Sequence, residues 1–295
     1  YNIIFSGSSV IEGFGRLPVV NSLSRIVTTF NLVGLKGPRE DRINVLLLGQ
    51  GGKGHPGPLL TDTIILASLK PSTGQVALMS IPRDFLVEVP NHGWQKINSA
   101  NALGETEGEN RGGQLAAAVV EDVFGEPVPY WLRVDFTGFA KLIDEIGGLD
   151  IDVPRSFTDT QFPDNQFGVM EISFDAGRQH FDGERALQYV RSRHGTGGEG
   201  SDFARARRQQ QVIVALKDKV LSSQTLFNPQ RLISILKVLG DSIATNIKLT
   251  QIDDLLEIAK EVEMESISSQ VLDDRPGGLL VGRVDTNGAY VLVPR

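Results

Sequence analysis

Residues 43–48 read Ile-Asn-Val-Leu-Leu-Leu, and the glycine-rich loop Gly49 to Pro58 follows them. A short apolar run of this kind is typical of a strand that is buried on both faces. Two further strands are predicted at Thr63 to Leu69 and at Gln75 to Ile81. The proline and glycine of Lys70-Pro-Ser-Thr-Gly74 between them favour a hairpin. The fold is therefore expected to begin with three neighbouring strands.

The register of this hairpin places two charged residues together. If Leu69 pairs with Gln75, counting outward sets Asp62 opposite Pro82. Asp62 and Arg83 are then expected to emerge at the same edge of the sheet, where the glycine-rich loop also ends.

Downstream of the hairpin, segments with a helical period alternate with a further strand. The predicted helices lie at Gln114 to Phe124, Phe136 to Ile146 (stopped by Gly147-Gly148), Ser201 to Leu221, and as a pair within Leu232 to Met264 that breaks near Thr245-Asn246; the strand lies at Leu149 to Val153. The alternation predicts an α/β fold, in which a sheet carries helices on both faces.

The composition limits the classes of function. A chain of 295 residues with 40% hydrophobic residues can bury a sizeable core. The net charge of -7 argues against a general nucleic-acid binder, because such proteins need a broad positive potential. There is no cysteine, so disulfides, a thiol nucleophile and a cysteine-ligated metal are excluded. The absence of cysteine fits an exported protein.

Residues 1–40 differ from the rest of the chain. Apolar residues recur at roughly helical spacing between Ile11 and Leu35. This pattern predicts an amphipathic N-terminal segment packed on the main domain, with a membrane-surface helix as the alternative. The chain starts at Tyr1, and we expect residues 1–40 to follow a membrane anchor that has been removed. Residues 41–295 are expected to form one main domain.

An unusual number of arginines lies between positions 185 and 208, where Glu199 and Asp202 are the only acids. The guanidinium group stays charged and binds phosphate oxygens in pairs, so the cluster predicts a phosphate or pyrophosphate site. A solvated basic face is the alternative. The arginines are Arg185, Arg191, Arg193, Arg205, Arg207 and Arg208.

The helix that begins near Ser201 presents part of this cluster. At 3.6 residues per turn, Arg205, Arg208 and Gln209 share one stripe with the apolar residues further along, whereas Arg207 points to solvent. The helix N-terminus itself favours an anion. Ser201 or Asp202 is the expected N-cap. Asp202 either caps the helix, or orients Arg205 or a metal-bound water.

Two other arginines of the cluster, and one lysine outside it, are candidates for the same anion site. Arg191 and Arg193 are expected to point the same way from an extended segment. Two adjacent guanidinium groups repel each other unless an anion lies between them. Lys96 adds another positive charge, with simple exposure to solvent as the alternative.

The glycine-rich loop matches two nucleotide-binding patterns only in part. Gly49-Gln50-Gly51-Gly52-Lys53-Gly54 has the spacing of a dinucleotide fingerprint, but His55-Pro56-Gly57-Pro58 prevents the helix that must follow. A P-loop is excluded, because Gly54 stands where serine or threonine is required. We interpret the loop as the flexible rim of a site, with a plain surface loop as the alternative.

A series of short motifs occurs in unbroken order between Asn44 and Leu221. They are Asn44-Val-Leu-Leu-Leu-Gly49, Asp62-Thr63, Ser80-Ile-Pro-Arg83-Asp84, Lys96-Ile-Asn98, Gly147-Gly148-Leu-Asp150, Gly183-Glu-Arg-Ala-Leu-Gln-Tyr-Val-Arg191-Ser-Arg193 and Asp202-Phe-Ala-Arg205-Ala-Arg-Arg208-Gln209-Gln210. In this order they resemble the LytR-CpsA-Psr family of extracytoplasmic glycopolymer transferases.

The resemblance implies a fold, an activity and a location. The fold is a three-layer α-β-α arrangement, in which a mixed central sheet lies between helices and a hydrophobic pocket holds a lipid. The activity is that of a phosphotransferase, which moves a glycosyl phosphate from a polyprenyl-pyrophosphate-linked glycopolymer onto a peptidoglycan acceptor and releases polyprenyl phosphate. The implied location is the bacterial cell envelope, outside the cytoplasm and anchored to the cytoplasmic membrane. No nucleic acid is expected as a partner.

The resemblance also assigns site residues, motif by motif. It implies that the pyrophosphate is bound by the catalytic residues Arg83, Arg191, Arg193 and Arg205. It also implies that the catalytic Asp62 is the ligand for magnesium or manganese. Supporting contacts to substrate fall on Lys96, Arg208, Gln209 and Asp202.

One position departs from the family pattern. Gln50 stands where the family commonly has an aspartate that serves as a second metal ligand. With glutamine at this position, phosphate oxygens and waters can still complete the coordination of a metal. Loss of transferase activity is the other outcome that this change allows. Two alternatives are therefore kept: a polyprenyl pyrophosphatase that uses water as acceptor, and a protein that binds polyprenyl phosphate without turnover.

Phosphoryl transfer asks a protein mainly for positioning and charge stabilisation, so an arginine cluster with one metal-binding carboxylate is a sufficient site. The acceptor hydroxyl must still lose a proton. Asp84, Asp202 and His194 are the candidate bases, and the sequence does not choose among them.

Overall fold

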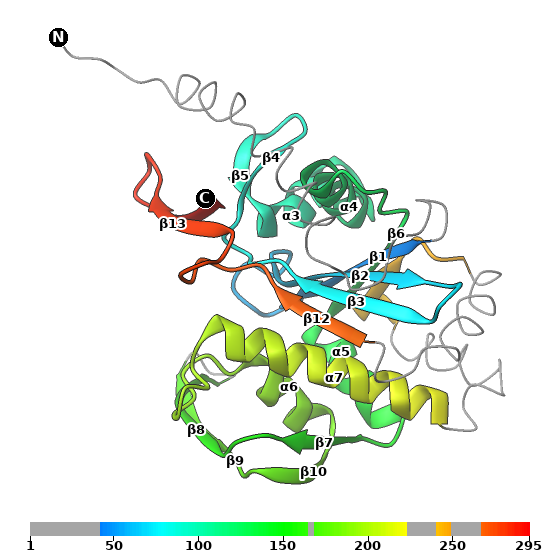
Figure 1. Cartoon of the computed structure of the whole chain (residues 1–295), viewed down its shortest axis with the longest axis vertical. Helices are drawn as coiled ribbons and strands as arrows, with labels where there is room; N and C mark the ends of the chain where they lie inside the picture. The colour runs from blue at the N-terminus through cyan, green and yellow to red at the C-terminus, as the bar shows by residue number, and fades with distance from the viewer. Residues whose placement is uncertain (1–41, 165–167, 223–239, 249–266) are drawn as a thin grey trace. The chain divides into compact units, whose positions relative to one another are not determined.

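The computed structural model describes residues 42–164, 168–222, 240–248 and 267–295 (Figure 1). These residues divide into two compact units. Unit 1 holds residues 42–133, 244–248 and 267–295, and unit 2 holds residues 134–164, 168–222 and 240–243. The predicted N-terminal segment 1–40 and most of the predicted helix pair in 232–264 lie outside the described residues. Where the pair is described, the prediction is wrong, because Ile243–Thr245 is a strand rather than helix. Within the described ranges, no helix has the length and apolarity needed to cross a membrane.

The described residues of unit 1 are built on a six-stranded mixed sheet with the order β11-β6-β1-β2-β3-β12. Strands β1 to β3 form an antiparallel meander, and β12 runs parallel to β3. The strands are β1 (Ile43–Gln50), β2 (Thr61–Lys70), β3 (Gln75–Ser80), β6 (Tyr130–Asp135), β11 (Ile243–Thr245) and β12 (Ile267–Val271). The predicted α/β class with a mixed central sheet is confirmed.

Strand β1 was predicted correctly, but the burial of its two faces was not. Asn44, Leu46 and Leu48 are buried, whereas the residues between them are only half-buried. The prediction of a strand buried on both faces is therefore wrong. An uninterrupted apolar run has no period, so it does not reveal which face is the more deeply covered.

The hairpin register differs from the prediction by one residue. Lys70 pairs with Gln75, and Leu69 pairs with Val76 instead. The turn therefore needs only Pro71 to Gly74, where Gly74 has a φ of 64° and the Thr73 amide donates to the Lys70 carbonyl (3.2 Å). Carried outward, this register sets Asp62 level with Arg83 rather than with Pro82.

Two helices, α3 (Ala100–Glu107) and α4 (Arg111–Phe124), pack on the sheet of unit 1 (Figure 1). Helix α3 was not predicted, and α4 begins before the predicted Gln114. Helix α4 approaches its neighbours through glycine, because a Cβ on Gly113 would lie 2.3 Å from the Trp131 ring. The remaining elements of unit 1 are β4 (Leu86–Val89), β5 (Gly93–Lys96), the 3-10 helix η2 (Ile97–Ser99), β13 (Leu280–Val284) and β14 (Tyr290–Pro294).

Unit 2 combines helices with two-stranded sheets around an aromatic core. Strand β7 pairs with β10 and β8 pairs with β9, both antiparallel. Tyr189 packs against the rings of Phe157, Phe174 and Phe181, with ring centroids 5.1 to 6.1 Å apart, and Phe174 also packs against Phe157 (5.0 Å) and Phe181 (5.5 Å). The elements are α5 (Phe136–Glu145), β7 (Leu149–Val153), β8 (Phe157–Pro163), β9 (Val169–Phe174), β10 (Gly177–Phe181), α6 (Gly183–Arg191), α7 (Asp202–Ser222) and the 3-10 helix η3 (Gly240–Ser242).

The predicted strand at 149–153 is confirmed, and the predicted helices at 136–146 and 201–221 are confirmed to within one residue at each end. Gly147 and Gly148 end α5 with φ angles of 81° and 74°, which glycine adopts readily. Strands β8 to β10 were not predicted.

Candidate functional site

The edge of the sheet in unit 1 carries a chain of four charged side chains, which we call the edge cluster: Asp62, Arg83, Asp84 and Lys96. Arg83 Nη1 donates to Asp62 Oδ1 at 2.7 Å, and Arg83 Nε lies 3.5 Å from Asp84 Oδ2. Lys96 Nζ donates to Asp84 Oδ1 at 2.6 Å. The predicted meeting of Asp62 and Arg83 is confirmed, and Asp84 links Lys96 to them.

Backbone hydrogen bonds fix the segment that carries Arg83. The Asn98 amide donates to the Arg83 carbonyl (3.3 Å), and the Ile97 amide donates to the Phe85 carbonyl (2.8 Å). On β14, the Leu292 amide donates to the Asp84 carbonyl (2.9 Å). The side chains of the cluster are 21% to 42% exposed, so the charged groups are held in place and remain accessible to a ligand.

Gln50 is not part of the edge cluster and belongs to a buried polar network. Asn101 Nδ2 donates to Gln50 Oε1 (3.2 Å) and to the Leu59 carbonyl (2.7 Å). Arg133 Nη1 donates to Asn101 Oδ1 (2.9 Å) and to Glu105 Oε1 (2.6 Å). Burial alone would raise the pKa of Glu105, but its hydrogen bonds, first that from Arg133, outweigh burial and lower it. The network ties both ends of the glycine-rich loop to α3.

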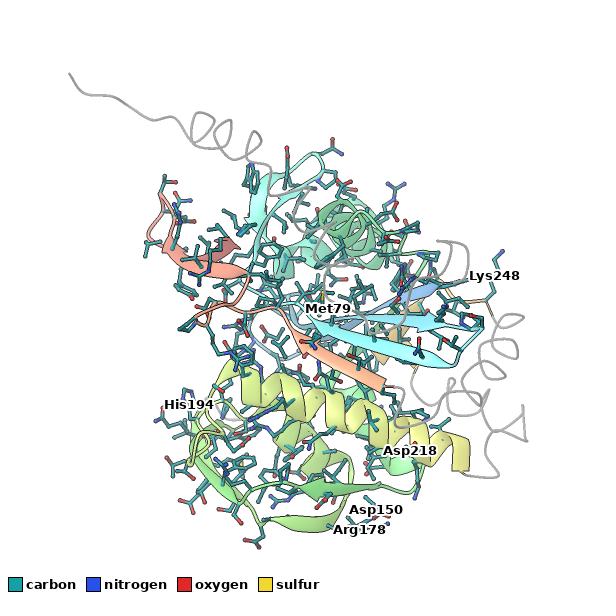
Figure 2. All side chains as sticks on the ribbon, viewed as in Figure 1. Met79, Asp150, Arg178, His194, Asp218 and Lys248 are labelled. Carbon is teal, nitrogen blue, oxygen red and sulfur yellow. The ribbon has the colours of Figure 1, made fainter. Side chains whose placement is uncertain are left out.

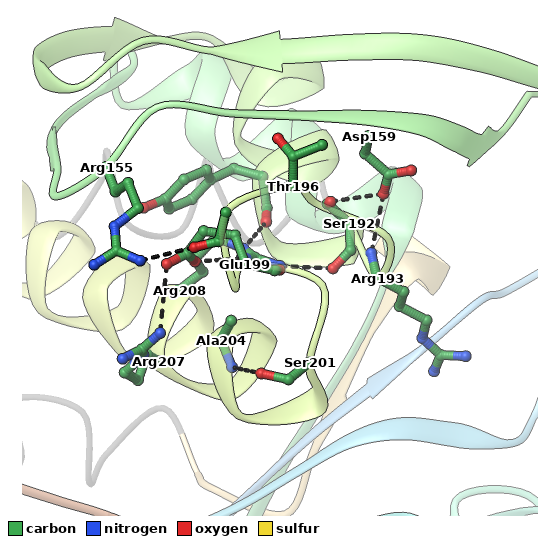
Figure 3. Close-up of polar contacts among 12 residues, drawn as sticks. Arg155, Asp159, Ser192, Arg193, Thr196, Glu199, Ser201, Ala204, Arg207 and Arg208 are labelled. Atoms are coloured by element: carbon green, nitrogen blue, oxygen red, sulfur yellow. Dashed lines mark hydrogen bonds and ion pairs between the residues drawn. The ribbon is translucent and has the colours of Figure 1, made fainter.

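In unit 2, the buried Arg208 side chain is bonded to the segment that precedes α7 (Figure 3). Arg208 Nε donates to the Tyr189 carbonyl (2.8 Å), and Nη2 donates to the Ser192 carbonyl (2.6 Å). Nη1 donates to the Glu199 carbonyl (3.0 Å) and to its carboxylate (2.9 Å). Burial lowers the pKa of the Arg208 guanidinium, and Glu199 opposes that shift. Four of the five N–H groups of Arg208 thus have partners within unit 2.

The start of α7 resolves the two roles considered for Asp202. Ser201 Oγ accepts a hydrogen bond from the Ala204 amide at 3.1 Å, as an N-cap does. Asp202 Oδ1 lies 2.7 Å from Arg205 Nη1, so Asp202 pairs with Arg205.

The predicted stripe on α7 is confirmed in part, because Gln209 and Leu216 on it are only half-buried. Arg205, Arg208 and Val212 are buried, and Arg207 is exposed. Gln209 is half-buried, and its amide donates to the Val190 carbonyl at 3.4 Å.

One expectation about the arginines is wrong. Arg191 is the last residue of α6 rather than part of an extended segment. The argument that Arg191 and Arg193 point the same way therefore does not apply, because it requires an extended backbone. The Arg191 guanidinium lies over the rings of Phe136 (4.3 Å) and Phe162 (5.2 Å). Asp182 caps the start of this helix, where it accepts a hydrogen bond from the Arg185 amide.

The predicted site residues fall in both units. Unit 1 brings Asp62, Arg83 and Lys96 into one cluster, and unit 2 brings Asp202 to Arg205. The binding of pyrophosphate by these residues, and the catalytic role of each, stay predictions. The residues that the sequence interpretation missed are Asn101, Glu105 and Arg133 in unit 1 and Asp159 in unit 2. Asn101 and Glu105 have helical spacing, which would have become informative had α3 been predicted.

Comparison with known proteins places these motifs in a family. Residues 23–294 match the model of the LytR_cpsA_psr family. The chain belongs to the LytR_cpsA_psr family. The match includes the edge cluster, the Gln50 network and the arginines of unit 2.

Curated relatives within the LytR_cpsA_psr family carry two kinds of name. The chain is 31% identical over 218 residues to the polyisoprenyl-teichoic acid–peptidoglycan teichoic acid transferase TagU of Oceanobacillus iheyensis, a match that covers 74% of this chain and 62% of the relative. It is 32% identical over 200 residues to the regulatory protein MsrR of Staphylococcus aureus, covering 67% of this chain and 55% of the relative. The chain thus spans less than two thirds of the length of both relatives.

Solved structures of the LytR_cpsA_psr family share the fold. Bacillus subtilis TagV matches with a TM-score of 0.65 and 27% identity, over 86% of this chain and 91% of that chain. TagT bound to LI-WTA matches with a TM-score of 0.65 and 25% identity, over 89% of this chain and 88% of that chain. These likenesses agree with the predicted α/β fold with its mixed central sheet, whereas the predicted hydrophobic pocket stays a prediction.

Proposed function

We propose that this protein is a phosphotransferase that moves a glycosyl phosphate from a polyprenyl-pyrophosphate-linked glycopolymer onto peptidoglycan. Membership of the LytR_cpsA_psr family supports the proposal, as do three relatives named polyisoprenyl-teichoic acid–peptidoglycan teichoic acid transferases. The observation that carries it is the half-exposed pair of Arg83 and Asp62, with Nη1 and Oδ1 2.7 Å apart at the edge of the sheet. A cation for phosphate and a carboxylate for metal are thereby held side by side.

The proposed reaction breaks one bond of the pyrophosphate and forms one bond. The acceptor hydroxyl of peptidoglycan attacks the phosphorus that bears the sugar, and the bond from that phosphorus to the bridging oxygen breaks. Polyprenyl phosphate leaves with the bonding electron pair. Arg83 stabilises the charge that develops on the phosphate oxygens. Arg191, Arg193 and Arg205 of unit 2 are the other residues proposed to bind pyrophosphate. The acceptor hydroxyl gives up its proton to a base, and among the candidate bases the Asp84 carboxylate lies in the same cluster as Arg83.

Asp62 is the proposed ligand for magnesium or manganese. Within the described residues, no three His, Cys, Asp or Glu side chains group together as metal ligands. Magnesium is commonly held by one or two carboxylates, with phosphate oxygens and waters completing the octahedron. The half-exposed Asp62 carboxylate fits that pattern. Bound there, the metal would neutralise charge on the pyrophosphate, and Asp62 would hold it next to Arg83.

The proposed location is outside the cytoplasm, at the bacterial cell envelope, with anchoring to the cytoplasmic membrane. This location follows from the substrates proposed, because peptidoglycan and lipid-linked glycopolymers meet there. Proposed partners are the polyprenyl pyrophosphate lipid, its glycopolymer and peptidoglycan.

The test is an assay of the purified protein with a synthetic polyprenyl-pyrophosphate-linked saccharide, peptidoglycan fragments and magnesium. We expect a saccharide phosphate on the acceptor and release of polyprenyl phosphate, both measured by mass spectrometry, and both lost in EDTA. Phosphate or saccharide phosphate released without acceptor would instead indicate a pyrophosphatase. Binding without turnover would indicate a lipid-phosphate-binding protein.

Replacing Gln50 by aspartate is expected to tighten magnesium binding. Gln50 pairs with Thr61 across β1 and β2, next to Asp62, so the substitution adds a second carboxylate near the proposed metal ligand. One added anionic ligand should lower the magnesium concentration for half-maximal binding on the order of tenfold, measured by calorimetry. Gln50→Ala is the matched control, because it removes the amide and adds no charge. Equal affinities in both variants would contradict metal binding beside Asp62.

A further inference from the structure

The α6–α7 loop, residues 192–201, carries Arg193, one of the arginines proposed to bind pyrophosphate. It is rich in glycine, yet the described contacts fix its course. Arg208 bonds to the carbonyls of Ser192 and Glu199 from the side of α7. From the side of β8, the Thr196 amide donates to the Thr158 carbonyl (3.0 Å), and the Thr158 amide donates to Thr196 Oγ1 (3.0 Å).

Asp159 makes the most concentrated set of these contacts (Figure 3). Its Oδ2 accepts three hydrogen bonds from consecutive residues: Ser192 Oγ at 2.7 Å, the Arg193 amide at 3.1 Å and the His194 amide at 3.1 Å. Its Oδ1 accepts from the Gln161 amide at 2.9 Å. Asp159 is 1% exposed. A carboxylate this deeply buried is costly unless it is fully hydrogen-bonded, and here both oxygens are.

The backbone of β8 is irregular where Asp159 emerges. The pairing of β8 with β9 shifts register between Asp159 and Phe162. Thr160 and Gln161 are both exposed, which a regular alternation does not allow. Such bulges redirect side chains and are common next to functional sites. The bulge brings the Gln161 amide to Asp159, so the orientation of this carboxylate is itself fixed.

We propose that Asp159 is a positioning residue that fixes the backbone of Arg193 and thereby presents its guanidinium in one orientation to a phosphate ligand. Figure 3 shows the Arg193 side chain extending away from Asp159, so the carboxylate holds the base of this side chain and leaves its charged end directed elsewhere. The inference rests on the proposed function for the role of Arg193. It assigns to Asp159 no contact with substrate.

Asp159→Asn tests the inference with little change of shape. An asparagine keeps one acceptor oxygen, but its NH2 group meets an N–H donor on the other side, and the negative charge is lost. Asp150→Asn is the matched control, because Asp150 is an exposed carboxylate of the same unit that accepts a hydrogen bond from Arg178 and pairs with His180. Figure 2 labels Asp150 and Arg178.

The first readout is amide hydrogen exchange of the intact protein. In Asp159→Asn, exchange of the Arg193 and His194 amides is expected to accelerate roughly tenfold or more, because the hydrogen bonds that protect them weaken. In Asp150→Asn the same amides should exchange as in the wild type. Unchanged exchange in Asp159→Asn would overturn the inference.

The second readout is a double-mutant cycle with Arg193→Ala in the transferase assay. Alone, Asp159→Asn is expected to lower kcat on the order of tenfold to a hundredfold, as a small misplacement of a catalytic group does. In the Arg193→Ala background, the same substitution should change kcat less than about twofold, because its effect acts through Arg193. Additive losses would show that Asp159 affects kcat independently of Arg193 and would overturn the inference.

The two readouts separate the inference from the proposed function. If the wild type shows no turnover, or Arg193→Ala is fully active, the proposed role of Arg193 fails. The exchange measurement then decides whether Asp159 fixes the Arg193 backbone. Faster exchange in Asp159→Asn, with wild-type exchange in Asp150→Asn, supports that part of the inference.

Discussion

Arg83→Ala is expected to lower kcat on the order of 100- to 1,000-fold, because it removes the donor that we propose stabilises the charge on the transferred phosphate. The same change should cost less than about 1 kcal/mol of unfolding free energy, since the ion pairs of Arg83 with Asp62 and Asp84 are partly exposed and screened by solvent. The measurements are steady-state kinetics in the transferase assay and urea unfolding followed by circular dichroism.

Arg178→Ala is the matched control for Arg83. Arg178 is 79% exposed and also pairs with a carboxylate, that of Asp150, so its loss should change neither kcat nor stability appreciably. Arg83→Lys should recover only part of the activity, because an ammonium group cannot donate in the planar fork of a guanidinium. Full activity in Arg83→Ala would exclude the edge cluster as the site of reaction.

The largest expected loss of stability belongs to Arg208→Leu. The substitution leaves the Glu199 carboxylate and the carbonyls of Tyr189 and Ser192 without the buried donor that they share. Removing one partner of a buried ion pair costs about 3 to 5 kcal/mol, so urea unfolding should show a loss in that range. Arg207→Leu is the matched control, because Arg207 is 62% exposed and lies 3.5 Å from the same Glu199 carboxylate; we expect a change of less than about 0.5 kcal/mol there.

A second substitution identifies the source of this loss. In Arg208→Leu, changing Glu199 to glutamine as well removes the uncompensated charge and should restore part of the stability. If Arg208→Leu is as stable as Arg207→Leu and raises only KM, then Arg208 acts chiefly as a substrate contact, the role that the family resemblance assigns to it. A loss of stability with unchanged KM would assign it to the structure of the α6–α7 loop.

The meeting of Asp62 and Arg83 was predictable although the register was not. Both residues lie beyond the paired part of the hairpin, where β2 begins and β3 has ended. An error of one residue in the pairing shifts partners along the strands but leaves both groups at the same edge. The predicted register was wrong because the proline and glycine indicate a turn but do not fix how many residues it contains. Lys70 therefore belongs to β2 rather than to the turn.

Helix α7 was equally predictable from local signals. Ser201, the stripe of Arg205, Arg208 and Val212, and the exposed Arg207 all follow from capping and a period of 3.6 residues. The extended segment expected for Arg191 failed because the cap at Asp182 starts a helix that runs through Arg191. A short amphipathic helix and a short strand are hard to distinguish from so few residues.

By itself, the sequence determined the family, the α/β class, the three strands of the meander and the presence of an arginine cluster, because periodicity, capping and motif order are local. Only the tertiary structure decided what each charged side chain contacts. Asp159 reaches Arg193 across 34 residues, and Asn101 reaches Gln50 across 51. Contacts at such separations depend on how strands and helices pack and on a bulge in β8, and no local pattern of residues encodes them.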